Sequence, residues 1–104
     1  MTMQYLYNIT TLVAHPIASD WLNWMKTHHI PQIMATGCFL EYRLLKLKEQ
    51  DETEGLTYSL QLLADNRGNY DKYLEQFAPA LREDARQHWA DNALSFRTLM
   101  EFVN

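Results

Sequence analysis

The sequence contains few cysteine, glycine and proline residues, and therefore lacks the disulfides and metal sites with which many small proteins stabilise a small core. Cys38 is its single cysteine, so no disulfide can form within the chain and a cysteine-rich zinc site is excluded. Glycine and proline occur three times each, and the glycines are isolated, which excludes a glycine-rich phosphate-binding loop. Stability must therefore come from an apolar core. The 104 residues, 47% of them hydrophobic, suffice for one domain over residues 1–104.

Basic residues and long apolar runs are scarce as well. Nine Lys and Arg are outnumbered by 13 Asp and Glu, and the basic residues are scattered rather than clustered. Such a surface excludes nucleic acids and anionic membranes as partners. No run approaches the roughly 18 apolar residues of a membrane-spanning helix, and the N-terminus lacks the features of a signal peptide. We expect a soluble protein of a bacterial-type cytoplasm.

Four segments alternate in hydrophobicity with the period of two that is typical of strands. They cover residues 4–13, 38–49, 56–64 and 94–103. The acidic stretch 50–55 joins the second segment to the third over a short distance, which predicts a β-hairpin.

Two further segments, residues 16–34 and 70–90, repeat their apolar residues with the 3.6-residue period of a helix. Pro31 and Pro79 lie inside these segments and predict a kink or a break in each helix. The resulting order β-α-β-β-α-β predicts an α+β fold, the ferredoxin-like plait. In this fold a four-stranded antiparallel sheet carries both kinked helices on one face.

The two faces of the sheet are expected to differ. The side chains expected beneath the helices are those of Tyr5, Tyr7, Ile9, Leu40, Tyr42, Leu44, Tyr58, Leu60, Phe96, Met100 and Phe102. The opposite face mixes apolar groups such as Phe39 and Leu99 with charges of both signs, and such a patch favours a cover. A second copy of the sheet is the simplest cover, which predicts a homodimer; an ordinary solvent-facing sheet is the alternative. The predicted dimer face carries Glu41, Arg43, Gln61, Arg97 and Glu101.

Four stretches carry a resemblance to a known family. Residues 20–31 (DWLNWMKTHHIP) resemble the signature of a small bacterial family, the domain-of-unknown-function family numbered 4286. Residues 35–37 (ATG), 77–81 (FAPAL) and 96–101 (FRTLME) resemble its other marks, in the same order. This resemblance implies no assigned activity. More remotely, a plait with a kinked first helix is similar to the dimeric α+β barrel superfamily. That similarity implies two paired sheets, a pocket between sheet and helices, and relatives that include monooxygenases and isomerases.

His28 and His29 are the side chains with the most versatile chemistry. Neighbours on a helix point about 100° apart, and no further ligands stand at metal-binding spacing, so we expect no metal site. His28 shares the apolar stripe of Trp21 and Trp24 and should point toward the sheet, either as a core histidine or as the polar contact of a pocket. His29 either caps the turn that Pro31 disrupts or transfers protons.

An inner layer of aromatic side chains is either core packing or the wall of an apolar pocket. The candidate pocket residues are Trp21, Trp24, His28, His29, Tyr42 and Tyr58. The sequence names no catalytic residue and indicates no cofactor. The leading hypothesis is a binding or interaction module for an apolar small molecule or a protein. The alternative is a cofactor-free enzyme of the dimeric α+β barrel kind, monooxygenase- or isomerase-like, with a histidine in the pocket.

Overall fold

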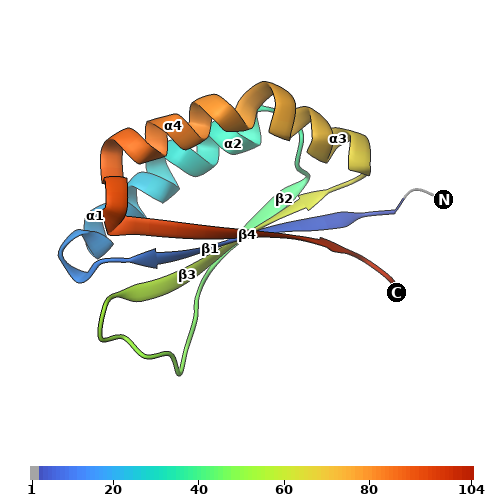
Figure 1. The fold of residues 1–104 in the computed structure, drawn as a ribbon. Coiled ribbons are helices and arrows are strands. Elements are labelled where there is room, and N and C mark those ends of the chain that lie inside the picture. Colours follow the sequence, from blue (N-terminus) through green and yellow to red (C-terminus); the bar gives the residue numbers. More distant parts are fainter. Residues whose placement is uncertain (1–2) are drawn as a thin grey trace.

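A computed structural model of the chain describes residues 3–104. Its elements follow the predicted order (Figure 1): β1 (Tyr5–Val13), α1 (Ala18–Trp24), α2 (Ile30–Ala35), β2 (Glu41–Lys46), β3 (Leu56–Ala64), α3 (Arg67–Lys72), α4 (Ala78–Trp89) and β4 (Ala93–Glu101). The π turn Met25–His29 joins α1 to α2, and the π turn Tyr73–Phe77 joins α3 to α4. Short 3₁₀ turns, His15–Ile17 and Ala90–Asn92, precede α1 and β4.

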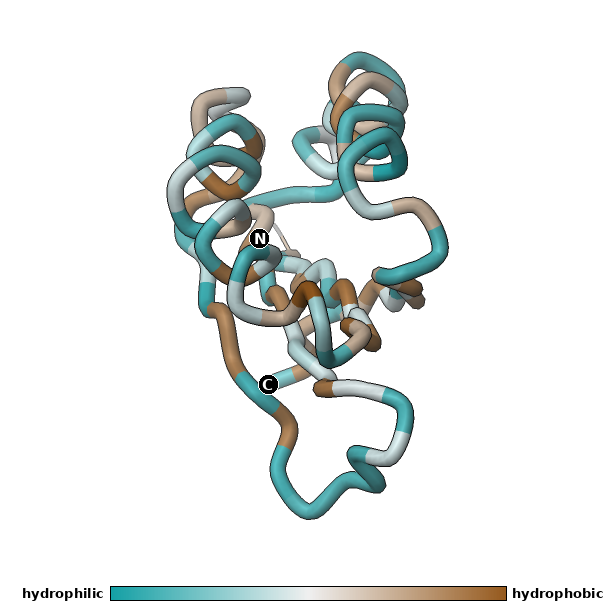
Figure 2. Tube along the Cα trace, turned by 90° about the vertical axis from the view of Figure 1, so that its left-hand side faces the viewer, coloured by the Kyte–Doolittle hydropathy of each residue, from teal (hydrophilic) through white to brown (hydrophobic). Residues whose placement is uncertain are grey.

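The strands form one antiparallel sheet in the order β2-β3-β1-β4. Both helical columns lie side by side on the same face of this sheet, and the other face carries no helix (Figures 1 and 2). The predicted ferredoxin-like plait and the β2–β3 hairpin are therefore confirmed. Within residues 3–104, no helix is long and apolar enough to cross a membrane.

The predicted interruptions of both helices take the form of π turns. The backbone N–H of Ile30 bonds to the carbonyl of Met25, five residues earlier, and Pro31 follows directly. Because proline has no N–H and its ring crowds the preceding turn, a wider turn accommodates it. A π turn contains one residue more than an α-helical turn, and the spacing of the buried residues shows this. Buried residues are three or four positions apart on either side of the turn but five apart across it, as in Ala18, Trp21, Met25, Ile30 and Ile33.

The core lies between the sheet and the helices, as expected for β1 and β3. Tyr7 and Val13 of β1 and Leu60 and Leu62 of β3 are almost completely buried there. Tyr7 sits at the centre, where its ring packs edge-on against Tyr70 at 5.2 Å. The alternation of these two strands therefore predicts their inner faces correctly.

The predicted faces of β4 are wrong. Arg97 pairs with Ile9, and Leu99 with Tyr7, which places both on the helix-covered face together with Glu101. Phe96 and Met100 lie on the outer face, 69% and 40% exposed. Both parities of this edge strand contain apolar residues, so alternation alone does not orient it. Arg97 and Glu101 therefore do not share a face with Arg43 and Gln61.

The beginning of β2 also differs from the prediction. The strand starts at Glu41 rather than residue 38, so the residues before it do not alternate. Phe39 turns into the core and packs against Tyr73 with ring centroids 4.9 Å apart. Leu40 is 59% exposed, and Tyr42, on the edge strand, is half exposed although it shares the inner face.

Candidate functional site

A cavity of about 230 Å³ lies between the helices and the sheet. The first helical column contributes Trp21, Trp24, Met25 and His29, and α4 contributes Leu81, Arg82, Ala85, Arg86 and Trp89. The floor comes from the inner face of β1, β3 and β4. All three tryptophans of the protein therefore line this one space.

His29 enters the cavity wall because of the π turn. With ordinary helical spacing His28 would follow Trp21 and Met25 on the inward stripe, but the extra residue of the turn rotates His29 toward that side. The His29 ring stacks on Trp24 with centroids 4.6 Å apart and planes at 18°. Trp24 in turn meets Trp89 of α4 edge-on at 5.7 Å. These rings form a continuous aromatic wall across both helical columns.

Three nitrogens of this wall have no hydrogen-bond partner among residues 3–104. They are Nε1 of Trp24, Nε1 of Trp89 and Nδ1 of His29, each buried among the described residues. A buried polar group without a partner costs about 1–3 kcal/mol. The cap predicted for His29 on the turn before Pro31 is not formed through Nδ1, because this atom has no partner in the described chain. Three such groups in one wall set this region apart from ordinary core packing.

Burial controls the electrostatics of the wall. Desolvation is the main cause that lowers the pKa of His29 to about 4; the nearby Asp84 carboxylate opposes it, and His28, Arg97 and His88 each add a smaller lowering effect. The imidazole is therefore neutral at pH 7. Desolvation also raises the pKa of Tyr73 to about 12, so its hydroxyl keeps its proton. The wall thus presents neutral rings and cationic guanidinium groups.

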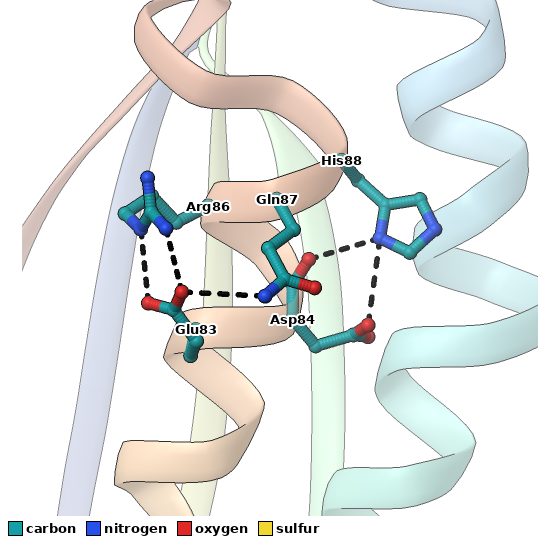
Figure 3. Close-up of polar contacts among 5 residues, drawn as sticks. All are labelled: Glu83, Asp84, Arg86, Gln87 and His88. Carbon is teal, nitrogen blue, oxygen red and sulfur yellow. Dashed lines mark hydrogen bonds and ion pairs between the residues drawn. The ribbon is translucent and has the colours of Figure 1, made fainter.

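His28 lies outside the cavity, contrary to its predicted orientation. Its side chain is 43% exposed, and Nε2 lies 3.1 Å from Oδ2 of Asp84 on α4. His88 reaches the same residue, with Nδ1 2.9 Å from the Asp84 carbonyl oxygen and 3.5 Å from Oδ1 (Figure 3). Asp84 thus ties the two helical columns together on the solvent side of Trp24. The cluster of His28, Asp84 and His88 therefore holds in place the helices that form the cavity wall.

The structure brings together half of the predicted pocket residues. Trp21, Trp24 and His29 line the cavity. Tyr58 packs behind Trp21 at 5.2 Å, while Tyr42 and His28 lie away from it. The prediction missed the contributions of α4 and β4.

One signal could have revealed the contribution of α4. Trp89 continues the apolar stripe of Leu81 and Ala85, which marks it as inward-facing. No such signal exists for Arg97, because the sequence does not show which face of β4 is turned toward the helices. Residues 3–104 contain no group of three His, Cys, Asp or Glu side chains placed to hold a metal ion.

Comparison with known proteins identifies a family by sequence and several solved structures that share the fold. The profile of the family described as Domain of unknown function (DUF4286) matches residues 4–103. No curated protein matches the chain.

Several solved structures share the fold. SnoaB of Streptomyces nogalater, a cofactor-independent oxygenase, is 11% identical with a TM-score of 0.69, over 96% of this chain and 94% of that one. A dimeric ferredoxin-like protein from an uncultured marine organism is 12% identical with a TM-score of 0.67, over 98% of this chain and 97% of that one. An ethyl tert-butyl ether d (ethd) family protein of Bacillus halodurans is 10% identical with a TM-score of 0.67, over 93% of this chain and 97% of that one. At such identities the likeness establishes the fold alone.

Proposed function

The chain belongs to the domain-of-unknown-function family DUF4286, and from this premise we propose that it is a small-molecule-binding protein. Its ligand is a flat, largely apolar molecule that enters the cavity between helices and sheet. The observation that carries the proposal is the aromatic wall, in which Trp24, Trp89 and His29 hold three buried nitrogens without partners.

The volume of the cavity limits the size of the ligand. A dry cavity of about 150 Å³ is known to hold one benzene ring, and pockets for drug-sized ligands occupy about 300–1,000 Å³. At about 230 Å³ this cavity lies between the two. One or two fused rings therefore fit, and they would pack against indole faces that favour stacked or edge-on aromatic contacts.

The local strain at the end of α4 supports a functional role for the same region. Ala90 lines the cavity and has φ 47° and ψ −129°, a conformation that favours glycine. Such a residue costs about 1–3 kcal/mol, and strained residues cluster at binding sites. Unpaired nitrogens and a strained residue in one wall are together a cost that core packing alone does not require.

The alternative function, a cofactor-free enzyme, has one observation in its favour. His29 is neutral, lines the cavity and has an unpaired Nδ1 that can accept a proton. A base whose pKa is about 4 is weak, however, because general bases are most efficient when their pKa lies near the working pH. We therefore place binding first and proton transfer second.

We also propose that two copies associate through the outer face of the sheet. Leu45, Leu94, Phe96 and Met100 are each at least 40% exposed on this face. A solved structure with the same fold is described as a dimeric ferredoxin-like protein, which supports such pairing.

We propose a reducing bacterial cytoplasm as the location of the protein, in keeping with its single, buried cysteine.

Light scattering at micromolar concentration tests this association. We expect twice the chain mass for the wild type and a monomer for Phe96→Glu, because sheet-on-sheet contacts of standard size hold at that concentration. A concentration-independent wild-type monomer would overturn the proposal.

Titration with 1-naphthamide, a neutral two-ring probe, tests the binding function through tryptophan fluorescence. Ala85 lines the cavity, so Ala85→Phe should fill it and abolish the fluorescence change. Ala80, exposed on the same helix, supplies the matched control, and Ala80→Phe should leave binding intact. No fluorescence change in the wild type with this amide or with its carboxylate analogue 1-naphthoate, or an equal change in Ala85→Phe, would contradict binding in this cavity.

A further inference from the structure

The cavity gathers positive charge in a protein that is acidic as a whole. Three of the five arginines, Arg82, Arg86 and Arg97, line it. No Asp or Glu of residues 3–104 does, although the chain contains 13 acidic against nine basic residues. A wall that collects guanidinium groups and excludes carboxylates attracts anions.

Two of the three arginines already have partners. Arg82 donates to the Tyr7 hydroxyl oxygen over 2.9 Å. Arg86 forms a two-pronged pair with Glu83, with distances of 2.9 and 2.6 Å (Figure 3). Arg97 makes no side-chain hydrogen bond or ion pair with any residue of the described chain. Of the three guanidinium groups in the wall, that of Arg97 is therefore the one whose N–H donors have no acceptor among the described residues.

The position of Arg97 links it to the aromatic wall. It rises from the inner face of β4 beside Ile9, two residues from Ser95, whose hydroxyl pairs with that of Thr11 at 2.8 Å. Its charge acts on His29, which it helps to keep neutral. Arg97 on the floor and His29 on the helical side therefore face the same space.

We propose that the ligand carries a single anionic oxygen group, a carboxylate or an equivalent oxyanion, and that Arg97 binds it. This inference rests on the proposed binding function and specifies its ligand class. A guanidinium presents two parallel N–H donors to a carboxylate, a stronger contact than a neutral hydrogen bond. Two aromatic N–H groups without partners, in Trp24 and Trp89, add donors rather than acceptors to the same wall. One available guanidinium in a largely aromatic cavity fits a monoanion better than a phosphate.

A matched pair of probes tests the inference at about pH 7.5, where a carboxylic acid is fully ionised. 1-Naphthoate and 1-naphthamide have the same rings and differ in charge, and tryptophan fluorescence reports both. We expect the wild type to bind naphthoate about tenfold or more tightly than the amide. Arg97→Gln should remove the preference, and Arg97→Lys should keep part of it. Arg67→Gln, on α3 and outside the cavity lining, should leave it unchanged.

The outcomes separate this inference from the proposed function. If both probes bind the wild type equally, the anion preference is overturned while binding in the cavity stands. If naphthoate is preferred but Arg97→Gln keeps the preference, Arg97 is not the recognising group. If neither probe binds, both the ligand class and the binding function fail. Circular dichroism of Arg97→Gln confirms that the variant is folded.

Discussion

Acid should destabilise the protein through one side chain, His29. Burial holds its pKa near 4 in the folded chain, whereas the unfolded chain titrates near 6.5. The unfolded state therefore binds the proton first as the pH falls. The contribution of His29 to stability is complete above about pH 6.5 and is lost progressively toward pH 4.

The size of the effect follows from these two pKa values. Between about pH 7 and pH 5, His29 alone should lower the free energy of unfolding by about 2 kcal/mol. Urea denaturation at both pH values measures the change. His29→Phe keeps the stacking on Trp24 but removes the titrating group, so its stability should fall by about 2 kcal/mol less than that of the wild type.

A second histidine supplies the control. His15 lies in the exposed turn before α1, and His15→Gln should retain the full loss of stability in acid. An equal loss in the wild type and in His29→Phe would refute the burial of a neutral imidazole in the cavity wall.

Three further predictions concern the stability of the fold. Ala90→Gly should raise the free energy of unfolding by about 1 kcal/mol, because glycine adopts the observed backbone angles without strain; a lower melting temperature would contradict this. Gly55→Ala should cost about 2 kcal/mol or more, since its new Cβ would lie 2.2 Å from the Val13 carbonyl oxygen, whereas Gly68→Ala, on α3, should change stability little in the same melts. A chelator should leave the melting temperature unchanged, because the described residues offer no ligand set; a clear drop would reveal a structural metal.

The sequence predicts the fold well because β1 and β3 alternate cleanly and the two helical stripes are long. Tyr7, Leu60 and Leu62 lie on the buried face that period two assigns them. The edge strand β4 offers apolar side chains at both parities, and Phe96 is on the outer face. Its orientation depends on which side the helices cover and on what else covers the outside. Neither is encoded in the strand itself.

The candidate site depends on one extra residue in a helical turn. Pro31 signals an interruption, but a kink, a break and a π turn are all compatible with it. Only the π turn brings His29 rather than His28 to the cavity, because the inserted residue shifts every later position around the helix. Sequence periodicity assumes a constant 3.6 residues per turn. It therefore finds Trp21 and Trp24 before the turn and misassigns the histidine within it.

The most direct test of the cavity as a binding site uses its three tryptophans. Each contributes one indole N–H cross-peak to a ¹H–¹⁵N NMR spectrum, and all three side chains line the cavity. Upon saturation with 1-naphthoate, we expect the cross-peaks of Trp21, Trp24 and Trp89 to shift together. In the cavity-filled Ala85→Phe variant, 1-naphthoate should leave these cross-peaks at the positions that they have in the ligand-free spectrum of the same variant. Unchanged indole peaks, with shifts confined to amides of the outer face, would contradict the account.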